Sequence, residues 1–149
     1  MKIVIQRVTE ASVSVDGCLT GSIGHGMMVL VGIAEGDTEK EVDRLVAKTA
    51  SMRIFNDDNG IMNRSVKDVG GDVLAISQFT LLANTRKGNR PSYVMAAHPE
   101  VAEPLYERYC QGLSEVLERS VQRGVFGADM KVSLVNDGPV TIIVDTDQL

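Results

Sequence analysis

The chain has few of the side chains on which metal sites, disulfide scaffolds and common catalytic triads depend. It contains two cysteines, Cys18 and Cys110, without a Cys-x-x-Cys spacing, which argues against a zinc site and a disulfide framework. It contains two histidines, His25 and His98, and each falls at a predicted turn or element boundary. A Ser-His-Asp triad would need one of them as its base. We expect neither to be catalytic, so the sequence argues against that triad.

Common nucleotide-binding and hydrolase motifs are also absent. There is no Gly-x-Gly-x-x-Gly, phosphate loop, His-Glu-x-x-His or Gly-x-Ser-x-Gly. No apolar run approaches the ~18 residues of a membrane span, and the N-terminal run is too short for a signal peptide. We therefore expect a cytoplasmic protein with reduced thiols, no membrane contact, no metal and no cofactor.

The charge balance is acidic. The formal net charge is −5 and the pI is about 5.0, which argues against a basic face for DNA or long duplex contact. Three cations, Arg86, Lys87 and Arg90, nevertheless cluster within five positions. Two interpretations stay open: a solvated loop, or a local attraction for a nucleic acid.

Length and hydrophobic patterning predict one domain over residues 1–149. At 44% hydrophobic residues the chain can bury a proper core. Strands are predicted over 2–9, around 13–15 and over 18–24, with a tight hairpin turn at Asp16-Gly17. A continuous apolar run over 27–33 predicts a strand covered on both faces.

Two helices are predicted among further strands. Thr38 and Glu41 form a capping box that starts a helix over 38–51. A second helix is predicted over 99–123, with Gly124 as its C-terminal stop. The remaining predictions are short strands within 56–72, a strand over 73–80, a long loop over 83–98 and two final strands. The fold class is therefore α+β, with a mixed or mostly antiparallel sheet or barrel and two covering helices.

The final strand region contains an interruption. Residues 130–145 follow a strand pattern, but Gly138-Pro139 stands inside it. Proline has no backbone donor and is excluded from the middle of a paired sheet. The pair therefore either turns the chain or presents its carbonyl groups to something outside the sheet.

A polar cluster follows the apolar strand at 73–76. Ser77, Gln78, Phe79 and Thr80 place two hydroxyls, a carboxamide and an aromatic ring where that strand ends. One interpretation is an ordinary strand end whose hydroxyls satisfy local backbone groups. The other is a catalytic segment that supplies a nucleophile or stabilises a developing oxyanion.

Together, residues 77–80 and residues 136–141 (Asn-Asp-Gly-Pro-Val-Thr) resemble the two signature motifs of the D-aminoacyl-tRNA deacylases. The resemblance covers the whole chain and neither motif departs from the pattern. It includes the Gln6-Arg7-Val8 start, the Arg90-Pro91-Ser92 loop and the approach to the final strands at 128–130.

The resemblance implies an enzyme that hydrolyses the ester between a D-amino acid and the 3′ end of tRNA, and that also acts on glycine attached to tRNA-Ala. It implies a homodimer in which a cis Gly138-Pro139 pair of one subunit reaches into the site of the other. There the pair's carbonyl groups would reject L side chains by collision, with Arg7 holding the pair in place or, alternatively, lying on the surface.

The resemblance also implies roles for the strand-end cluster. The Phe79 backbone amide would stabilise the oxyanion, while Ser77, Gln78 and Thr80 would shape the pocket and hold the substrate. The 2′-hydroxyl of the terminal adenosine would activate water. Met130 would pack against the adenine, or serve as a core methionine. The alternatives are another esterase with a Ser or Thr nucleophile, and a non-enzymatic RNA-binding module.

Overall fold

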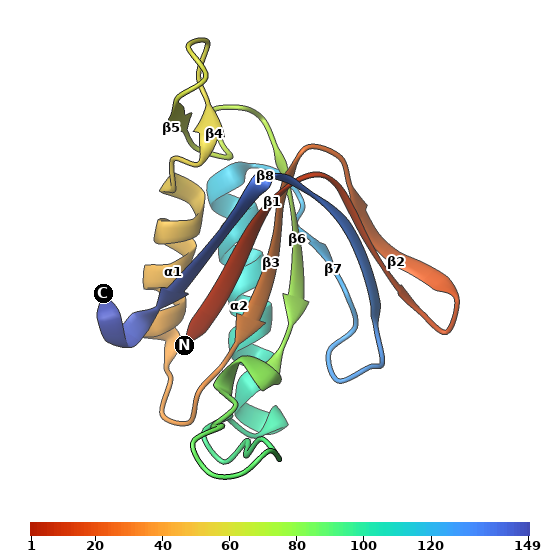
Figure 1. Cartoon of the computed structure of the whole chain (residues 1–149), viewed down its shortest axis with the longest axis vertical. Helices are drawn as coiled ribbons and strands as arrows, with labels where there is room; N and C mark the ends of the chain where they lie inside the picture. The colour runs from red at the N-terminus through yellow and green to blue at the C-terminus, as the bar shows by residue number, and fades with distance from the viewer.

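A computed structural model describes all 149 residues and contains two helices and a mixed sheet that nearly closes into a barrel (Figure 1). The α+β prediction is confirmed. The helices are α1 (Glu39–Ser51) and α2 (Pro99–Leu117), with short 3₁₀ turns η1 (Phe79–Leu82) and η2 (Thr146–Gln148). The strands are β1 (Lys2–Val15), β2 (Cys18–Ile23), β3 (Gly26–Gly32), β4 (Phe55–Asn56), β5 (Met62–Arg64), β6 (Asp72–Ser77), β7 (Gln122–Arg123) and β8 (Lys131–Asp145).

The long strand β1 organises the main sheet. It pairs antiparallel with β8 along its whole length, and on its other edge with β3 and then β2. Strands β6 and β7 continue from β3 in parallel. The β1–β2 turn is the predicted hairpin, in which Asp16 and Gly17 have φ angles of 50° and 78°. Both angles lie in the left-handed region that this turn requires.

The sheet separates two apolar cores because successive side chains point to opposite faces. The larger core contains 26 buried residues and lies between the sheet and both helices. The smaller core, with seven buried residues, lies on the other face and includes Leu74 and Ile76 of β6. Strand β6 thus supplies Val73 and Ala75 to the larger core, and it supplies the alternate residues, Leu74 and Ile76, to the smaller core. Burial on both faces holds the end of β6 in a fixed position.

Helix α1 begins as the sequence predicts, whereas α2 ends earlier. The Thr38 capping box is present. Helix α2 ends at Leu117, not at residue 123, because Glu118 adopts the left-handed cap conformation with φ 54°. The Ser114 hydroxyl then accepts a hydrogen bond from the Val121 amide at 3.0 Å, which directs the chain into β7. No helix of the structure is long and apolar enough to cross a membrane.

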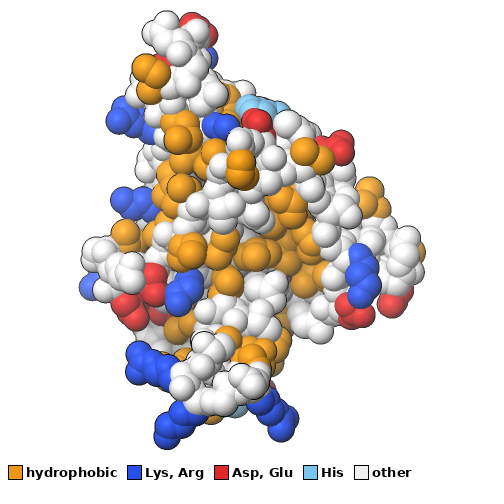
Figure 2. All heavy atoms as spheres, viewed as in Figure 1, with side chains coloured by type: hydrophobic (Ala, Val, Ile, Leu, Met, Phe, Trp, Pro, Cys, Tyr) orange, Lys and Arg blue, Asp and Glu red, His pale blue; other side chains and the backbone are white.

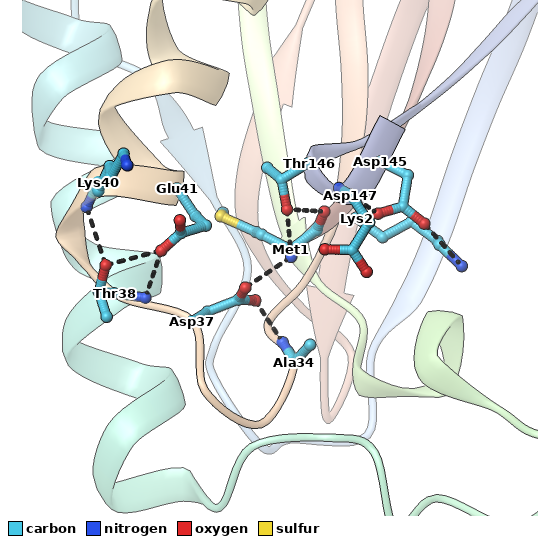
Figure 3. Close-up of polar contacts among 10 residues, drawn as sticks. All are labelled: Met1, Lys2, Ala34, Asp37, Thr38, Lys40, Glu41, Asp145, Thr146 and Asp147. Atoms are coloured by element: carbon cyan, nitrogen blue, oxygen red, sulfur yellow. Dashed lines mark hydrogen bonds and ion pairs between the residues drawn. The ribbon is translucent and has the colours of Figure 1, made fainter. Parts of the chain in front are cut away.

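The two ends of the chain lie together against the loop that precedes α1 (Figure 3). The Met1 ammonium donates to the Asp37 carboxylate at 2.7 Å and to the Thr146 hydroxyl at 2.8 Å. The other Asp37 oxygen accepts from the Ala34 amide at 2.6 Å. Because Met1 is buried, this ion pair ties β1, the β3–α1 loop and η2 at one end of the sheet.

Candidate active site

A cavity of about 540 Å³ opens beside the end of β6. Most of its lining comes from three parts of the chain: the end of β6 with η1, the segment that enters α2, and the segment between β7 and β8. The end of β3 adds Val31 and Ile33. The residues from the three main parts include Ser77, Gln78, Phe79, Tyr93, His98, Tyr106, Phe126, Asp129 and Met130. Most of the lining is apolar, with a few polar groups among it, which is typical of a small-molecule or cofactor site.

The strand-end cluster bends sharply as it enters this cavity. Strand β6 ends at Ser77, so the predicted strand over 73–80 is too long, and Phe79 begins η1. The Gln78 amide donates to the Val31 carbonyl at 2.8 Å, and its side-chain nitrogen donates to the Thr80 hydroxyl at 2.6 Å. These two bonds fix the turn that presents the first amide of η1.

Met130 forms part of the opposite wall. It is half-buried and packs against the smaller core. Its thioether lies against the backbone of Gly124, where a Cβ atom would overlap the sulfur. Met130 is therefore a core contact and a cavity-lining residue at once, and its contact with the adenine stays a prediction.

The Tyr106 phenol and the nearby Cys110 thiol are not poised for proton transfer or nucleophilic attack. Tyr106 is buried and donates to the Ala75 carbonyl at 2.8 Å. Burial raises the pKa of its hydroxyl far above the ordinary value. Burial likewise raises the pKa of the Cys110 thiol to about 11, so this thiol is not a nucleophile near neutral pH.

The second predicted motif forms a bulge in β8, which we call the Gly-Pro bulge (residues 137–140). Gln6 of β1 pairs with Thr141 and Val8 pairs with Asn136, so four residues of β8 lie opposite Arg7 alone. The prediction of two separate final strands is therefore wrong: β8 is one strand whose bulge removes Pro139 from the ladder. The Gly138-Pro139 bond is cis, and both residues are exposed.

Two side chains hold the Gly-Pro bulge. Asn136 closes it from within: its side-chain oxygen accepts from the Val140 amide at 2.8 Å. Arg7 holds it from β1, donating to the Asp137 carbonyl at 3.0 Å and to the Ile54 carbonyl at 2.7 Å. Arg7 is 7% exposed, which excludes the alternative that it is a surface arginine.

The structure brings together only part of the predicted site. Ser77, Gln78, Phe79 and Met130 line the cavity, and Thr80 adjoins it through its bond to Gln78. Arg7, Gly138 and Pro139 do not line it. Arg7 pairs with Met27 and Ser77 pairs with Val31, so the two groups are separated along β3 by four residues, about 13 Å.

Two lining residues were missed by sequence reasoning. His98 was assigned to an element boundary, where it does lie, but it also faces the cavity. Tyr93 stands in the predicted long loop, and its ring packs edge-on to Phe79 with centroids 5.1 Å apart. The length of that loop was the available signal. No group of three or more His, Cys, Asp or Glu residues is placed to hold a metal ion.

Comparisons with known proteins agree on one family. The family model described as D-Tyr-tRNA(Tyr) deacylase matches residues 4–145. A Porphyromonas gingivalis protein named D-aminoacyl-tRNA deacylase is 58% identical over 146 residues, covering 98% of this chain and 97% of the relative. A Bacteroides thetaiotaomicron protein of the same name is 56% identical with the same coverage.

Two solved structures have a similar fold. One, titled c-Myc DNA Unwinding Element Binding Protein, is 42% identical with a TM-score of 0.92, covering 98% of this chain and 99% of its own. Another, titled as a structural analysis of a probable eukaryotic D-amino acid tRNA deacylase, has a TM-score of 0.83 over 96% of this chain and 97% of its own. At 17% identity, the second similarity concerns the fold alone.

Proposed function

The chain belongs to the D-Tyr-tRNA(Tyr) deacylase family, and from this premise we propose how its residues carry out the family's reaction. Its activity is that of a D-aminoacyl-tRNA deacylase, a hydrolase that breaks the ester bond between a D-amino acid and tRNA. The observation that carries the proposal is the cavity where Ser77, Gln78 and Phe79 stand opposite Met130.

The ester carbonyl lies at the start of η1, where the Phe79 amide stabilises the oxyanion. The first amides of a helical turn have no acceptor within that turn, and Phe79 is the first residue of η1. Enzymes that catalyse acyl transfer usually stabilise the developing negative charge with a fixed backbone amide that points toward it. Gln78, Ser77 and Thr80 shape the pocket around the amino group and ribose, and Met130 packs against the adenine.

The attacking water is activated by the 2′-hydroxyl of the terminal adenosine. In support, Ser77 makes no side-chain hydrogen bond to a histidine or a carboxylate, as an activated serine would. One observation favours a competing mechanism: His98 lines the same cavity and could serve as a base for Ser77. In the first mechanism Ser77 only shapes the pocket, whereas in the second it is the nucleophile. Substitution of Ser77 therefore distinguishes the two mechanisms.

Selection against L-amino acids comes from the Gly-Pro bulge of a second copy of the chain. The bulge does not line the cavity of its own chain, its Gly138 and Pro139 are exposed, and Arg7 anchors it. A backbone wall held in this way collides with an L side chain and leaves a D side chain free. Glycine has no side chain to collide, so glycine attached to tRNA-Ala is also hydrolysed.

The protein acts as a homodimer formed through its open sheet. Figure 2 shows hydrophobic side chains gathered over the face that β8 and β1 present. On β8, Ile143 is 68% exposed and Val135 is 49% exposed. A contiguous apolar face of this kind is typical of an interface between subunits. We place the dimer in the cytoplasm, where charged tRNA is used.

Matched substrates test the proposal. Purified protein is incubated with D-tyrosyl-tRNA, L-tyrosyl-tRNA and glycyl-tRNA-Ala, and release of the amino acid is followed. We expect rapid release from the D-tyrosyl and glycyl forms and negligible release from the L form. Binding without release would indicate an RNA-binding module, and equal release from D and L forms would contradict the proposed selection.

A further inference from the structure

Two walls of the cavity come from a part of the chain whose charge is opposite to that of the whole. Residues 73–99 contain three of the 15 Lys and Arg residues and none of the 20 Asp and Glu residues. All three cations, Arg86, Lys87 and Arg90, are exposed. None of them takes part in an ion pair. In an acidic protein, such a segment is a local attraction for an anion.

These cations stand on a loop with a closed base, which we call the basic loop (residues 84–92). The Asn84 amide donates to the Ser92 carbonyl at 2.8 Å, and the Ser92 amide donates back to the Asn84 carbonyl at 3.0 Å. The Asn84 side chain also accepts from the Arg86 amide at 3.0 Å. Figure 2 shows Lys and Arg side chains projecting at the end of the molecule where Figure 1 draws this loop.

An exposed aromatic pair adjoins the base of the basic loop and the cavity. Phe79 is 57% exposed and Tyr93 is 39% exposed, their rings meet edge-on, and both line the cavity. Tyr93 directly follows the basic loop, and η1 connects Phe79 to its other end. Aromatic rings beside cations are the usual composition of a site for single-stranded nucleic acid, since bases stack and phosphates pair with the charges.

We propose that the aromatic pair and the basic loop form a track for the single strand that leads into the cavity. A base preceding the terminal nucleotide stacks on Tyr93, and the phosphates on its 5′ side lie along Arg86, Lys87 and Arg90. This inference rests on the proposed function, which places the terminal nucleotide in the cavity. It also resolves the conflict between an acidic protein and an RNA substrate, because only a short single strand needs to be neutralised.

The test compares a long and a minimal substrate. D-tyrosyl-tRNA engages the track, whereas 3′-D-tyrosyl-adenosine ends within the cavity. Tyr93→Leu keeps an apolar side chain without a ring, and Tyr93→Phe keeps the ring. We expect Tyr93→Leu to lower the ratio of kcat/KM on tRNA to kcat/KM on the adenosine ester by about tenfold, the effect of losing one base–aromatic stack. Tyr93→Phe should keep the wild-type ratio.

The charges are tested by a matched pair of double variants. Lys87→Gln/Arg90→Gln removes two cations of the basic loop, and Lys48→Gln/Arg53→Gln removes two exposed cations outside it. We expect the first to weaken the salt dependence of KM for D-tyrosyl-tRNA by about 0.7 in log–log slope per lost phosphate contact. The second should leave that slope at its wild-type value.

The outcomes separate this inference from the function on which it rests. If the wild-type protein releases no D-tyrosine from either substrate, the proposed function fails. If the wild type is active but Tyr93→Leu and Lys87→Gln/Arg90→Gln change neither the ratio nor the slope, the track is wrong. Equal losses by Tyr93→Leu on both substrates, with a change in sedimentation, would place Tyr93 in a subunit interface and also overturn the track.

Discussion

The Nε atom of Arg7 donates a hydrogen bond to the carbonyl oxygen of Asp137 at 3.0 Å, across 130 positions of sequence. The same guanidinium donates to the Ile54 carbonyl at 2.7 Å and to the Asn56 side chain at 3.3 Å. One buried arginine thus connects β1, the β4 region and the Gly-Pro bulge. The fork geometry of a guanidinium makes this possible, because several N–H groups point in fixed directions.

Substitution of Arg7 by lysine should loosen the Gly-Pro bulge while keeping the charge. An ammonium cannot reproduce the fork, and each lost charge-assisted hydrogen bond costs about 1.5–3 kcal/mol. We expect Arg7→Lys to lower the free energy of unfolding by about 2 kcal/mol or more and to reduce the D-over-L ratio of kcat/KM. Urea denaturation and paired kinetics measure the two effects. The control Arg53→Lys, on an exposed side chain, should stay within about 0.5 kcal/mol of wild type.

A methyl group at position 138 should disturb the bulge. Gly138 has a φ of 138°, and a Cβ there would lie 2.8 Å from Val140 Cγ2 and 3.2 Å from an Arg7 side-chain nitrogen. We expect Gly138→Ala to lose at least tenfold in D-specific turnover, since small displacements of positioning groups carry large kinetic costs, up to about 10²-fold per ångström. Gly24→Ala adds a methyl group where no atom lies within 4 Å and should behave as wild type. Unchanged selectivity in Gly138→Ala would refute the role of the bulge.

Removal of a single backbone N–H tests the oxyanion site. Proline suits the first position of a helical turn, and Phe79 holds that position in η1. Phe79→Pro therefore deletes the proposed donor, whereas Phe79→Ala deletes only the ring. We expect Phe79→Pro to lower kcat by about 10²- to 10³-fold relative to Phe79→Ala. Comparable kcat values in the two variants would exclude this amide from catalysis.

Ser77 and His98 decide between the two mechanisms. If the 2′-hydroxyl activates water, Ser77→Ala and His98→Ala should each keep kcat within about 10²-fold of wild type, well short of the ~10⁶-fold loss of a covalent nucleophile. A substrate ending in 2′-deoxyadenosine should then resist hydrolysis by the wild-type enzyme. A loss near 10⁶-fold in Ser77→Ala, with turnover of the deoxy substrate, would establish the nucleophilic mechanism.

Local patterns predicted most of the fold. The Thr38 capping box, the Asp16-Gly17 hairpin and the apolar strands were found correctly because each rests on contacts close in sequence. The helix predicted over 99–123 is longer than α2 because the prediction placed its C-terminal stop at Gly124. The actual cap, Glu118, adopts a left-handed conformation that its residue type does not favour.

The sequence predicted the separate segments of the site, but it did not predict how these segments are arranged in space. Residues 77–79 and Met130 meet in one cavity through the packing of β6 against the start of β8, which no local pattern encodes. The burial of Arg7 depends on partners 47 and 130 positions away. His98 was set aside as a boundary residue because its approach to the cavity depends on where α2 packs.

The central claim is that each site combines the cavity of one chain with the Gly-Pro bulge of another. Chains carrying Phe79→Pro and chains carrying Gly138→Ala are unfolded together, refolded as a mixture and assayed on D-tyrosyl-tRNA, with each variant alone as the control. In a mixed dimer, the intact cavity of the Gly138→Ala chain receives the intact bulge of the Phe79→Pro chain. Random pairing then restores about a quarter of wild-type D-specific turnover. If both parts had to belong to one chain, the mixture would show no more activity than the two variants measured separately, and the account would be wrong.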